Sequence, residues 1–250
     1  MNYVIRPIKI VIFYVNLIWL GAMLLTGSLL VLPLILTPAG IRQPVVQWGA
    51  SLIFRLFLAG VAITRIGRFD LAALDALKNE RRMLLVPNHP AMIDVFLILS
   101  RIPRAVCLMK ADISTNPFLG IGAYLAGYIS NRQPEKMFRA AIESVRAGNL
   151  LLIFPEGTRT TRQPINPIRN SVALIARRAQ APLQTLIITT NTPYLSKGWK
   201  IWRVPQFPIC YRVTIGERFE PRSSVADTSA LLQNYFERML VRSIDPDMVI

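Results

Sequence analysis

The pattern of apolar and charged positions divides the chain into two parts. Residues 10–41 contain no charged residue, and a second apolar stretch, residues 45–64, is interrupted only by Arg55. About twenty apolar residues are enough to cross a bilayer, so the first run alone is long enough. After Arg68, short apolar runs alternate with amphipathic stretches. We therefore predict membrane-associated helices in residues 1–66 and a separate folded domain in residues 67–250.

Basic residues flank the first apolar run on both sides, with Arg6 and Lys9 before it and several arginines after it. Because basic residues mark the cytoplasmic side of a membrane segment, this symmetry favours a helical hairpin or re-entrant element whose two ends are both cytoplasmic. Pro33, Pro38 and Gly40 would form its bend. A single transmembrane helix is the alternative. Either arrangement places the protein in a membrane, with the following domain on the cytoplasmic face, and a bacterial inner membrane is expected.

The remainder of the chain reads as alternating strands and helices. The patterns predict strands at residues 83–86, 104–109, 127–130, 150–154, 183–189 and 211–215, and helices at residues 91–99, 135–147, 170–180 and 231–241. Asp227, Thr228 or Ser229 would cap the last helix. Alternation of β and α with short connections is typical of an α/β fold, here a mixed sheet flanked by helices.

The charge balance changes this picture, because 29 Lys and Arg face only 14 Asp and Glu and give a net charge of +15. Such an excess indicates an anionic partner, which can be a nucleic acid, a membrane surface or a phosphorylated substrate. The basic residues are dispersed and no nucleic-acid-binding motif is present, so nucleic acid is not expected. A single histidine and two cysteines exclude a zinc site built from several histidines or from cysteines alone. We expect no metal.

That one histidine, His89, lies between a predicted strand and a predicted helix, in the run Asn88-His89-Pro90-Ala91-Met92-Ile93-Asp94. Its imidazole can take a proton near neutral pH. Asp94, one turn into the helix, can bond one ring nitrogen, fix the tautomer and leave the other nitrogen facing a substrate. A structural histidine that caps the helix is the other interpretation of this spacing.

Further strand ends carry residues suited to an anion. Gly157 lets the backbone approach a ligand, Thr158 offers a hydroxyl and an amide, and Arg159 offers a planar fork for phosphate oxygens. Gly127 to Arg132 again finishes a strand with an arginine, and Lys110 follows the strand at residues 104–109. Together with His89 these cations predict an anion pocket, although each alone would be read as a surface charge.

Taken in this order, the residues resemble the glycerolipid acyltransferase family, which includes enzymes that make phosphatidic acid from lysophosphatidic acid. The family's first motif is matched by Asn88, His89 and Asp94, and its third, Phe-Pro-Glu-Gly-Thr-Arg, in full at residues 154–159. Gly127 and Arg132 match the second motif. The stretch with Lys110, Pro117 and Gly120 is also similar to the family's pattern.

The resemblance implies a membrane-bound O-acyltransferase of the 1-acylglycerol-3-phosphate O-acyltransferase type. It would transfer a fatty acyl group from a thioester, acyl-CoA or acyl carrier protein, to the hydroxyl of a lysophospholipid, with no cofactor. His89 and Asp94 would be the catalytic pair. The substrate-binding set would comprise Asn88, Lys110, Arg132, Glu156, Gly157, Thr158 and Arg159, and Glu156 would also organise the third motif by accepting hydrogen bonds. Expected partners are the lysolipid acceptor, the acyl donor and anionic membrane lipid.

Two departures from the family leave the acceptor open. Thr185 stands where the family usually has a proline, and Ile168-Arg169-Asn170-Ser171 replaces a Phe-Lys-Lys-Gly-like run. Lysophosphatidic acid is the first candidate, and an amino-acid-containing or glycolipid acceptor is the second. A lipid hydrolase that uses His89 and Asp94 to activate water, or a basic membrane protein without chemistry, would be the reading from a different class.

A last pattern lies outside these motifs. Residues 197–203, Lys-Gly-Trp-Lys-Ile-Trp-Arg, interleave tryptophans with cations. Tryptophan favours the headgroup region of a membrane and cations favour anionic lipid. This predicts a second membrane contact, and tryptophans packed into the domain are the alternative.

Overall fold

The computed structural model describes residues 2–242, with side chains from Arg6 onward. Its centre is one sheet in the order β1-β7-β6-β2-β5-β3-β4. The strands are β1 Gly67–Asp70, β2 Met83–Pro87, β3 Ala105–Met109, β4 Ile129–Ser130, β5 Leu150–Leu152, β6 Leu183–Thr190 and β7 Ile209–Phe219. Every pairing is parallel except that of β6 with β7, which is antiparallel. The predicted mixed α/β sheet is confirmed.

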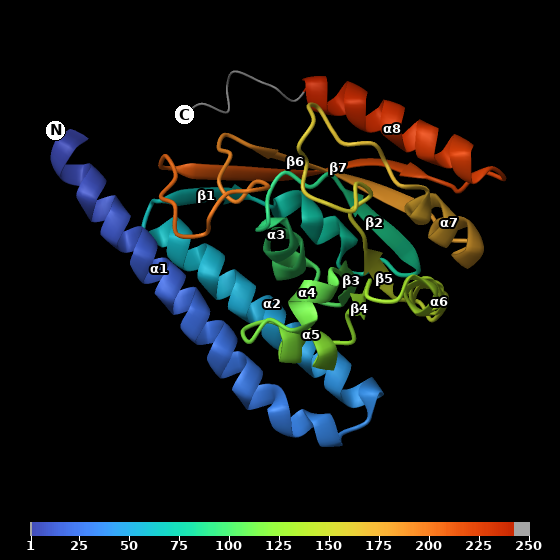
Figure 1. The fold of residues 1–250 in the computed structure, drawn as a ribbon, viewed down its shortest axis with the longest axis horizontal. Helices are drawn as coiled ribbons and strands as arrows, with labels where there is room; N and C mark the ends of the chain where they lie inside the picture. The colour runs from blue at the N-terminus through green and yellow to red at the C-terminus, as the bar shows by residue number, and fades with distance from the viewer. Residues whose placement is uncertain (1, 243–250) are drawn as a thin grey trace.

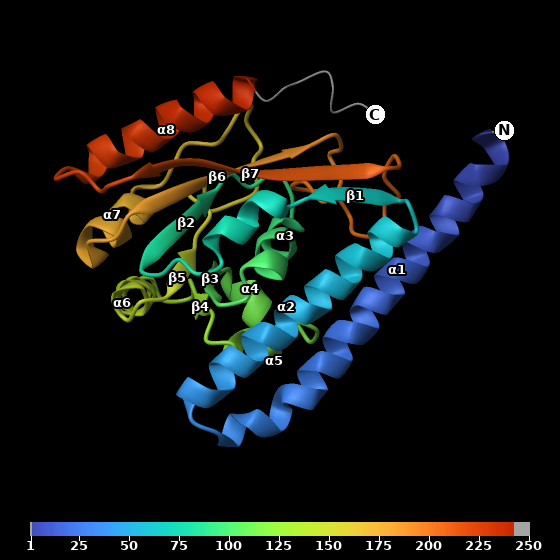
Figure 2. The ribbon, with the colours of Figure 1, turned by 180° about the vertical axis from the view of Figure 1, so that it is seen from behind.

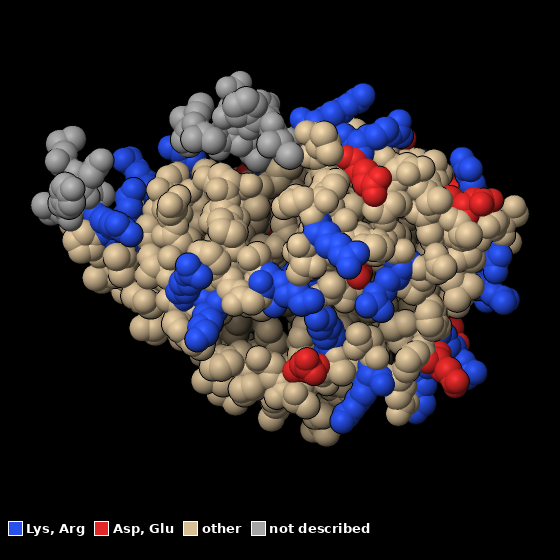
Figure 3. All heavy atoms as spheres, turned by 45° about the horizontal axis from the view of Figure 1, so that its top comes forward, with Lys and Arg blue, Asp and Glu red and all other residues tan. Residues whose placement is uncertain are grey.

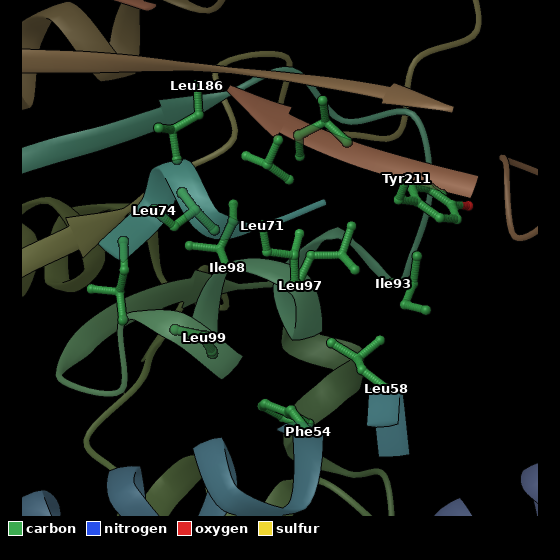
Figure 4. Packing of buried hydrophobic residues seen from close by; sticks show 14 of the residues in the cluster. Phe54, Leu58, Leu71, Leu74, Ile93, Leu97, Ile98, Leu99, Leu186 and Tyr211 are labelled. Carbon is green, nitrogen blue, oxygen red and sulfur yellow. The ribbon is translucent and has the colours of Figure 1, made fainter. Parts of the chain in front are cut away.

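Helices cover both faces of this sheet (Figures 1 and 2). They are α1 Asn2–Val31, α2 Ala39–Ile63, α3 Asp94–Arg101, α4 Ala111–Ser114, α5 Gly120–Leu125, α6 Pro134–Arg146, α7 Asn170–Ala179 and α8 Val225–Arg242, with 3-10 turns η1 Leu32–Leu36 and η2 Ala72–Leu77. One buried cluster joins the sheet to α2, α3 and η2, and another joins it to α6, α7 and α8. In Figure 4, Phe54 and Leu58 of α2 point toward Leu97 and Ile98 of α3, which lie between the hairpin and the sheet.

Residues 2–63 form the predicted pair of helices rather than a single helix. Leu32–Leu36 is a 3-10 turn with Pro33 at its start, and Pro38 immediately precedes α2. Gly40, which we expected in the bend, lies in the first turn of α2 instead. The bend therefore needs only the two prolines, since each fixes its own φ and removes a backbone donor.

The two helices differ in what they contact. From α2, Gln47 Nε2 donates to the Ala126 carbonyl at 2.9 Å and Ser51 Oγ to the Ser100 carbonyl at 3.3 Å. By contrast, α1 and the bend expose many large apolar side chains, and Leu36 at the tip is 89% exposed. The division at residue 66 falls between α2 and β1, but the hairpin shares its buried cluster with the following domain. Both helices are thus attached to that domain, α2 through these bonds and α1 through buried Phe13 and Leu20 and a hydrogen bond from Ser28 Oγ to the Phe118 carbonyl at 3.0 Å.

Several element boundaries differ from the prediction. Helix α3 begins at Asp94, not at residue 91, and the expected strand at 127–130 is reduced to Ile129–Ser130. Helix α8 begins at Val225, so the expected caps lie inside it; Ser224 Oγ accepts from the Asp227 amide instead. Strand β1 and the short helices α4 and α5 were not predicted. These pieces are short and gain their order from packing on α2 and the sheet rather than from a strong pattern.

Candidate active site

The sheet topology brings the candidate residues to one edge. Strands β6, β2, β5, β3 and β4 are adjacent and mutually parallel, so their carboxyl ends meet there. His89 follows β2, the turn at residues 154–159 follows β5, Lys110 follows β3 and Arg132 follows β4. The segment after β6 is the connection to β7. The rule that functional residues follow the carboxyl ends of parallel strands therefore predicts correctly that these residues lie at one edge of the sheet.

His89 and Asp94 form the pair that the sequence predicted. Nδ1 of His89 lies 2.9 Å from Oδ2 of Asp94, and the same oxygen accepts a hydrogen bond from the Ala91 amide at 2.9 Å. These bonds hold residues 89–93 in a turn, which is why α3 starts only at Asp94. A carboxylate can only accept, so Nδ1 carries the proton and Nε2 is the basic nitrogen. Burial raises the pKa of Asp94, and the hydrogen bond and charge of His89 oppose the rise.

The imidazole is partly open. Its side chain is 16% exposed, whereas that of Asp94 is fully buried. One ring face stacks on Phe154, with centroids 3.8 Å apart and planes at 24°. Phe154 comes from the third motif, at the end of the neighbouring strand. Ring orientation is thus fixed by a hydrogen bond from one side and a stacked ring from another, which leaves Nε2 for a substrate hydroxyl.

Glu156 connects the third motif to the histidine. Its Oε1 accepts from the His89 amide at 2.9 Å and from Thr160 Oγ1 at 2.8 Å, and its Oε2 accepts from the Asn166 amide at 3.0 Å. In return, the His89 carbonyl accepts from the Thr160 amide at 2.7 Å. The carboxyl group is buried, and burial raises its pKa while these bonds oppose the rise. Glu156 organises the motif, as predicted, and both of its oxygens are occupied by the chain.

Sequence reasoning missed Asn166. Its Oδ1 accepts from the amides of Thr161 and Arg162, both at 3.1 Å, and from Thr161 Oγ1 at 2.9 Å. Its Nδ2 donates to the Arg159 carbonyl at 3.2 Å. One buried side chain therefore closes the turn that carries Arg159. The Asn166-Pro167 dipeptide favours a turn and was the available signal.

Asn166→Ala should destabilise the protein, because three donors and one carbonyl lose their partner in a mostly buried turn. We expect a loss of roughly 1–3 kcal/mol in the free energy of unfolding, together with reduced turnover. Asn166→Asp keeps the acceptor and should lose less. Urea unfolding in detergent measures both variants, and an unchanged midpoint for Asn166→Ala would contradict this account.

Arg159 and Gly157 both have close neighbours within the chain, although Gly157 itself is exposed. The Arg159 guanidinium donates to the carbonyls of Leu195 and Ser196, both at 2.9 Å. Gly157 has φ +67°, and a Cβ there would lie 2.5 Å from Nε of Arg169, whose Nε donates to the Glu156 carbonyl at 3.2 Å. We expected the glycine to admit a ligand; the group that approaches it in the structure is Arg169.

Lys110 and Arg132 are exposed at the ends of β3 and β4. Asn131 joins these ends, because its Oδ1 accepts from the Ala111 amide at 2.9 Å and its amide donates to the Met109 carbonyl at 3.0 Å. Neighbouring strands lie about 4.8 Å apart, so the ends of β2 and β4 are about 14 Å apart. The two cations are thus close to each other and more distant from His89.

Asn88 lies on the other side of His89. Its amide nitrogen donates to the Ile188 carbonyl at 2.9 Å, and its amide oxygen accepts from the Ile188 nitrogen at 2.7 Å. The side chain therefore extends the pairing of β2 with β6 past Pro87. Thr185, one of the two departures, is also explained by the sheet: its hydroxyl donates to the Glu217 carbonyl at 2.8 Å, where the pairing of β6 with β7 is irregular.

Comparisons with known proteins show which family this part of the chain resembles. A family model described as Acyltransferase matches residues 68–189, a range that contains the His89–Asp94 pair and the strand-end residues Lys110, Arg132 and Arg159. Residues 68–189, just under half of the chain, are thus similar to the acyltransferase family.

Its relatives are named for one reaction. The 1-acyl-sn-glycerol-3-phosphate acyltransferase of Helicobacter pylori is 28% identical over 141 residues, 54% of this chain and 56% of the relative. That of Cocos nucifera is 31% identical over 118 residues, 44% of this chain and 38% of the relative. The chain thus aligns with about half of these proteins or less. A crystal structure of the 1-acyl-sn-glycerophosphate (LPA) acyltransferase PlsC from Thermotoga maritima shares the fold, with TM-score 0.72, 18% identity and 97% of both chains covered.

Proposed function

We propose that this protein transfers a fatty acyl group from a thioester to the free hydroxyl of lysophosphatidic acid, giving phosphatidic acid, at a membrane surface. The observation that carries the proposal is the oriented His89–Asp94 pair, with Nδ1 and Oδ2 at 2.9 Å, at a sheet edge that also carries Lys110 and Arg132. The names of the relatives point to the same acceptor.

The reaction needs one base and no covalent intermediate. His89 Nε2 takes the proton of the acceptor hydroxyl as its oxygen attacks the thioester carbonyl carbon. The new C–O ester bond forms, the C–S bond breaks, and the leaving thiolate receives the proton from the imidazolium. Asp94 holds the ring and stabilises its positive charge, which forms only during the reaction. A general base of this kind contributes a factor of roughly 10²–10⁴.

Phosphate recognition is assigned to the cations at the strand ends. Lys110 and Arg132 are exposed and follow the neighbouring strands β3 and β4, whose ends are joined by Asn131. Arg159 keeps part of its guanidinium fork, because the two bonds to Leu195 and Ser196 both use Nη1. Figure 3 shows basic side chains gathered around a hollow near the middle of one face, where acidic side chains are few. A phosphomonoester fits this charge better than a neutral headgroup does.

Membrane attachment is assigned to the hairpin. Its two helices are long and apolar enough to cross a bilayer. However, α2 is held against the catalytic part of the chain by Gln47, Ser51 and Arg55. We infer that the exposed side of α1 and the uncharged bend enter one leaflet, while the basic ends stay at the cytoplasmic surface, in a bacterium the inner membrane. This places the active site beside its lipid substrates.

The test is an acyl-transfer assay with purified protein, in which acyl-CoA and acyl carrier protein thioesters are each offered with a panel of lysolipids. We expect lysophosphatidic acid to be the best acceptor. Faster transfer to an amino-acid-containing or glycolipid acceptor would replace that assignment. Release of free fatty acid without an acceptor would indicate a hydrolase instead.

Arg132→Ala should act on the acceptor rather than on the chemistry. If its guanidinium binds the phosphate, a charge-assisted bond is lost, and we expect KM for lysophosphatidic acid to rise roughly tenfold or more with little change in kcat. KM for a lysolipid without a phosphomonoester should stay within about twofold. Arg238→Ala, on the exposed side of α8, removes the same charge elsewhere and is the matched control. A uniform loss with all acceptors would contradict this role for Arg132.

A further inference from the structure

The connection between β6 and β7, residues 191–208, lies at the same sheet edge as His89 and contains three cations, two tryptophans and no acidic residue. We call it the β6–β7 loop. In Figure 1 it runs beside the N-terminal half of α1. None of the family motifs described above falls within it. Those motifs therefore do not account for its basic and aromatic residues.

The two tryptophans of the loop have different surroundings. Trp199 is half-buried: its ring packs edge-on against Tyr194, its Nε1 donates to the Arg203 carbonyl at 3.0 Å, and the Arg203 guanidinium lies 4.4 Å from the ring centroid. Trp202 is 61% exposed and Ile201 is 40% exposed. The packed-tryptophan interpretation thus holds for the first ring, and the membrane interpretation remains open for the second.

The loop is fastened to α1, the outer helix of the hairpin. Tyr14 Oη donates to the Trp202 carbonyl at 3.1 Å, and Phe13 packs on Tyr194 with ring centroids 5.7 Å apart. Tyr14 is five residues beyond Lys9, which is about 8 Å along the helix axis. Trp202 therefore lies at the level where α1 changes from basic to apolar, which is the depth that tryptophan prefers in membranes.

We propose that Ile201 and Trp202 enter the headgroup region of an anionic membrane and that Lys197 and Lys200 bind its lipid phosphates. This makes the β6–β7 loop a second membrane contact beside the hairpin. The proposal deepens the proposed function, on which it rests, by naming the surface through which the site meets its lipid. Charge complementarity and continuity with the exposed apolar side of α1 support this partner rather than a protein.

The loop also contacts both catalytic turns. The Leu195 carbonyl accepts from the Met92 amide at 3.0 Å, within the His89–Asp94 turn, and from the Arg159 guanidinium of the third motif. Trp202 is thus in the same loop as Leu195, whose carbonyl is bonded to both turns of the site. The contact would hold the membrane surface next to the turns that carry His89 and Arg159.

The experiment uses the full chain in vesicles of equimolar phosphatidylcholine and phosphatidylglycerol. Trp19, Trp48 and Trp199 are replaced by Phe, so that Trp202 is the sole fluorophore, and quenching by lipids brominated near the headgroup end of the acyl chain is measured. A reference chain carries Asn234→Trp on exposed α8 with all four native tryptophans replaced. We expect Trp202 to be quenched severalfold more than the reference. Equal, weak quenching with free access to aqueous iodide overturns the proposal.

The test does not depend on the folding of these multiple variants. In the otherwise unaltered chain, the loss of quenching caused by Trp202→Ala measures the same contribution of Trp202 to quenching by the brominated lipid. In the single-tryptophan chain, Lys197→Gln with Lys200→Gln should weaken the contact by roughly fivefold per lysine in anionic vesicles and hardly at all in pure phosphatidylcholine. Unchanged quenching after both substitutions overturns recognition of anionic lipid. Quenching requires no turnover, so it can also be measured in His89→Ala. A failure of the loop contact is therefore distinguishable from a failure of the proposed reaction.

Discussion

His89→Ala is expected to lower kcat by 10²-fold to 10⁴-fold while the protein remains folded. The substitution removes the only imidazole in the chain, and hence the base that Asp94 and Phe154 orient. The neighbouring Glu156 carboxyl group cannot replace it in this geometry, since it is occupied by hydrogen bonds from the chain. The measurement is single-turnover acyl transfer to lysophosphatidic acid, with KM determined separately.

His89→Gln is the companion variant, because it retains a polar side chain of similar size that cannot act as a base near neutral pH. Both variants should bind the lysolipid with affinity close to that of the parent, since the phosphate is assigned to Lys110, Arg132 and Arg159. Circular dichroism and thermal unfolding establish that the fold is retained. More than a tenth of the parent kcat in either variant would show that another group takes the proton.

The parts of this site that the sequence predicted are those encoded locally. Asn88, His89 and Asp94 lie within one turn between a strand and a helix, and the hexapeptide 154–159 ends the next strand of the sheet. Both patterns depend on spacing along a short stretch of chain. Strand ends on one edge follow from a parallel sheet, which the alternation of strands and helices already indicated.

The parts that could not be predicted depend on residues far apart in the chain. Glu156 reaches back 67 positions to the His89 amide, and Arg159 reaches forward 36 and 37 positions to the carbonyls of Leu195 and Ser196. The spacing of apolar and polar residues along the chain does not indicate contacts between residues so far apart. The contacts of Gly157 with Arg169 and of Thr185 with Glu217 could not be predicted for the same reason, because each joins separate segments of the chain.

Local pattern also misplaced element boundaries where a side chain competes with the backbone. The apolar run after Pro90 predicts a helix from residue 91, but the Asp94 carboxylate accepts from the Ala91 amide and from His89, and helical structure starts only at Asp94. At α8 the helix extends further toward the N-terminus because Ser224 caps it. The first of these boundaries is a consequence of the hydrogen bonds that Asp94 accepts from His89 and Ala91.

Asp94→Asn is expected to lower kcat strongly, up to roughly ten-thousand-fold, as an Asp-to-Asn change beside a catalytic imidazole does when it upsets the tautomer. An amide can present its NH₂ group to Nδ1, which then accepts, and Nε2 would carry the proton instead of being the base. Even with the amide oxygen toward Nδ1, the imidazolium loses its counter-charge. KM for the lysolipid should change little, and kcat against pH should stay low throughout.

Although Asp94→Asn lowers kcat, it should raise the stability of the protein relative to the parent as the pH rises. Burial raises the folded-state pKa of Asp94 above its ordinary value of 3.8, so this carboxyl group contributes stability when protonated, and that contribution is lost as pH rises through the folded pKa. Asn at this position does not titrate. The Tm of Asp94→Asn relative to the parent should therefore increase from about pH 4 upward, since groups that do not contact Asp94 cancel in the difference.

Asp94→Ala separates the two effects, because it removes the charge and both hydrogen bonds that its Oδ2 accepts from His89 and Ala91. It should be inactive and also lower in Tm than Asp94→Asn at neutral pH, since the Ala91 amide then lacks a partner in a buried turn. A Tm difference between Asp94→Asn and the parent that is flat with pH would mean that the carboxyl group is not desolvated in solution. The assigned role of Asp94 would then be contradicted. A carboxylate that is kept from water destabilises the folded protein before the reaction, and for the same reason it strongly stabilises the imidazolium that forms during acyl transfer.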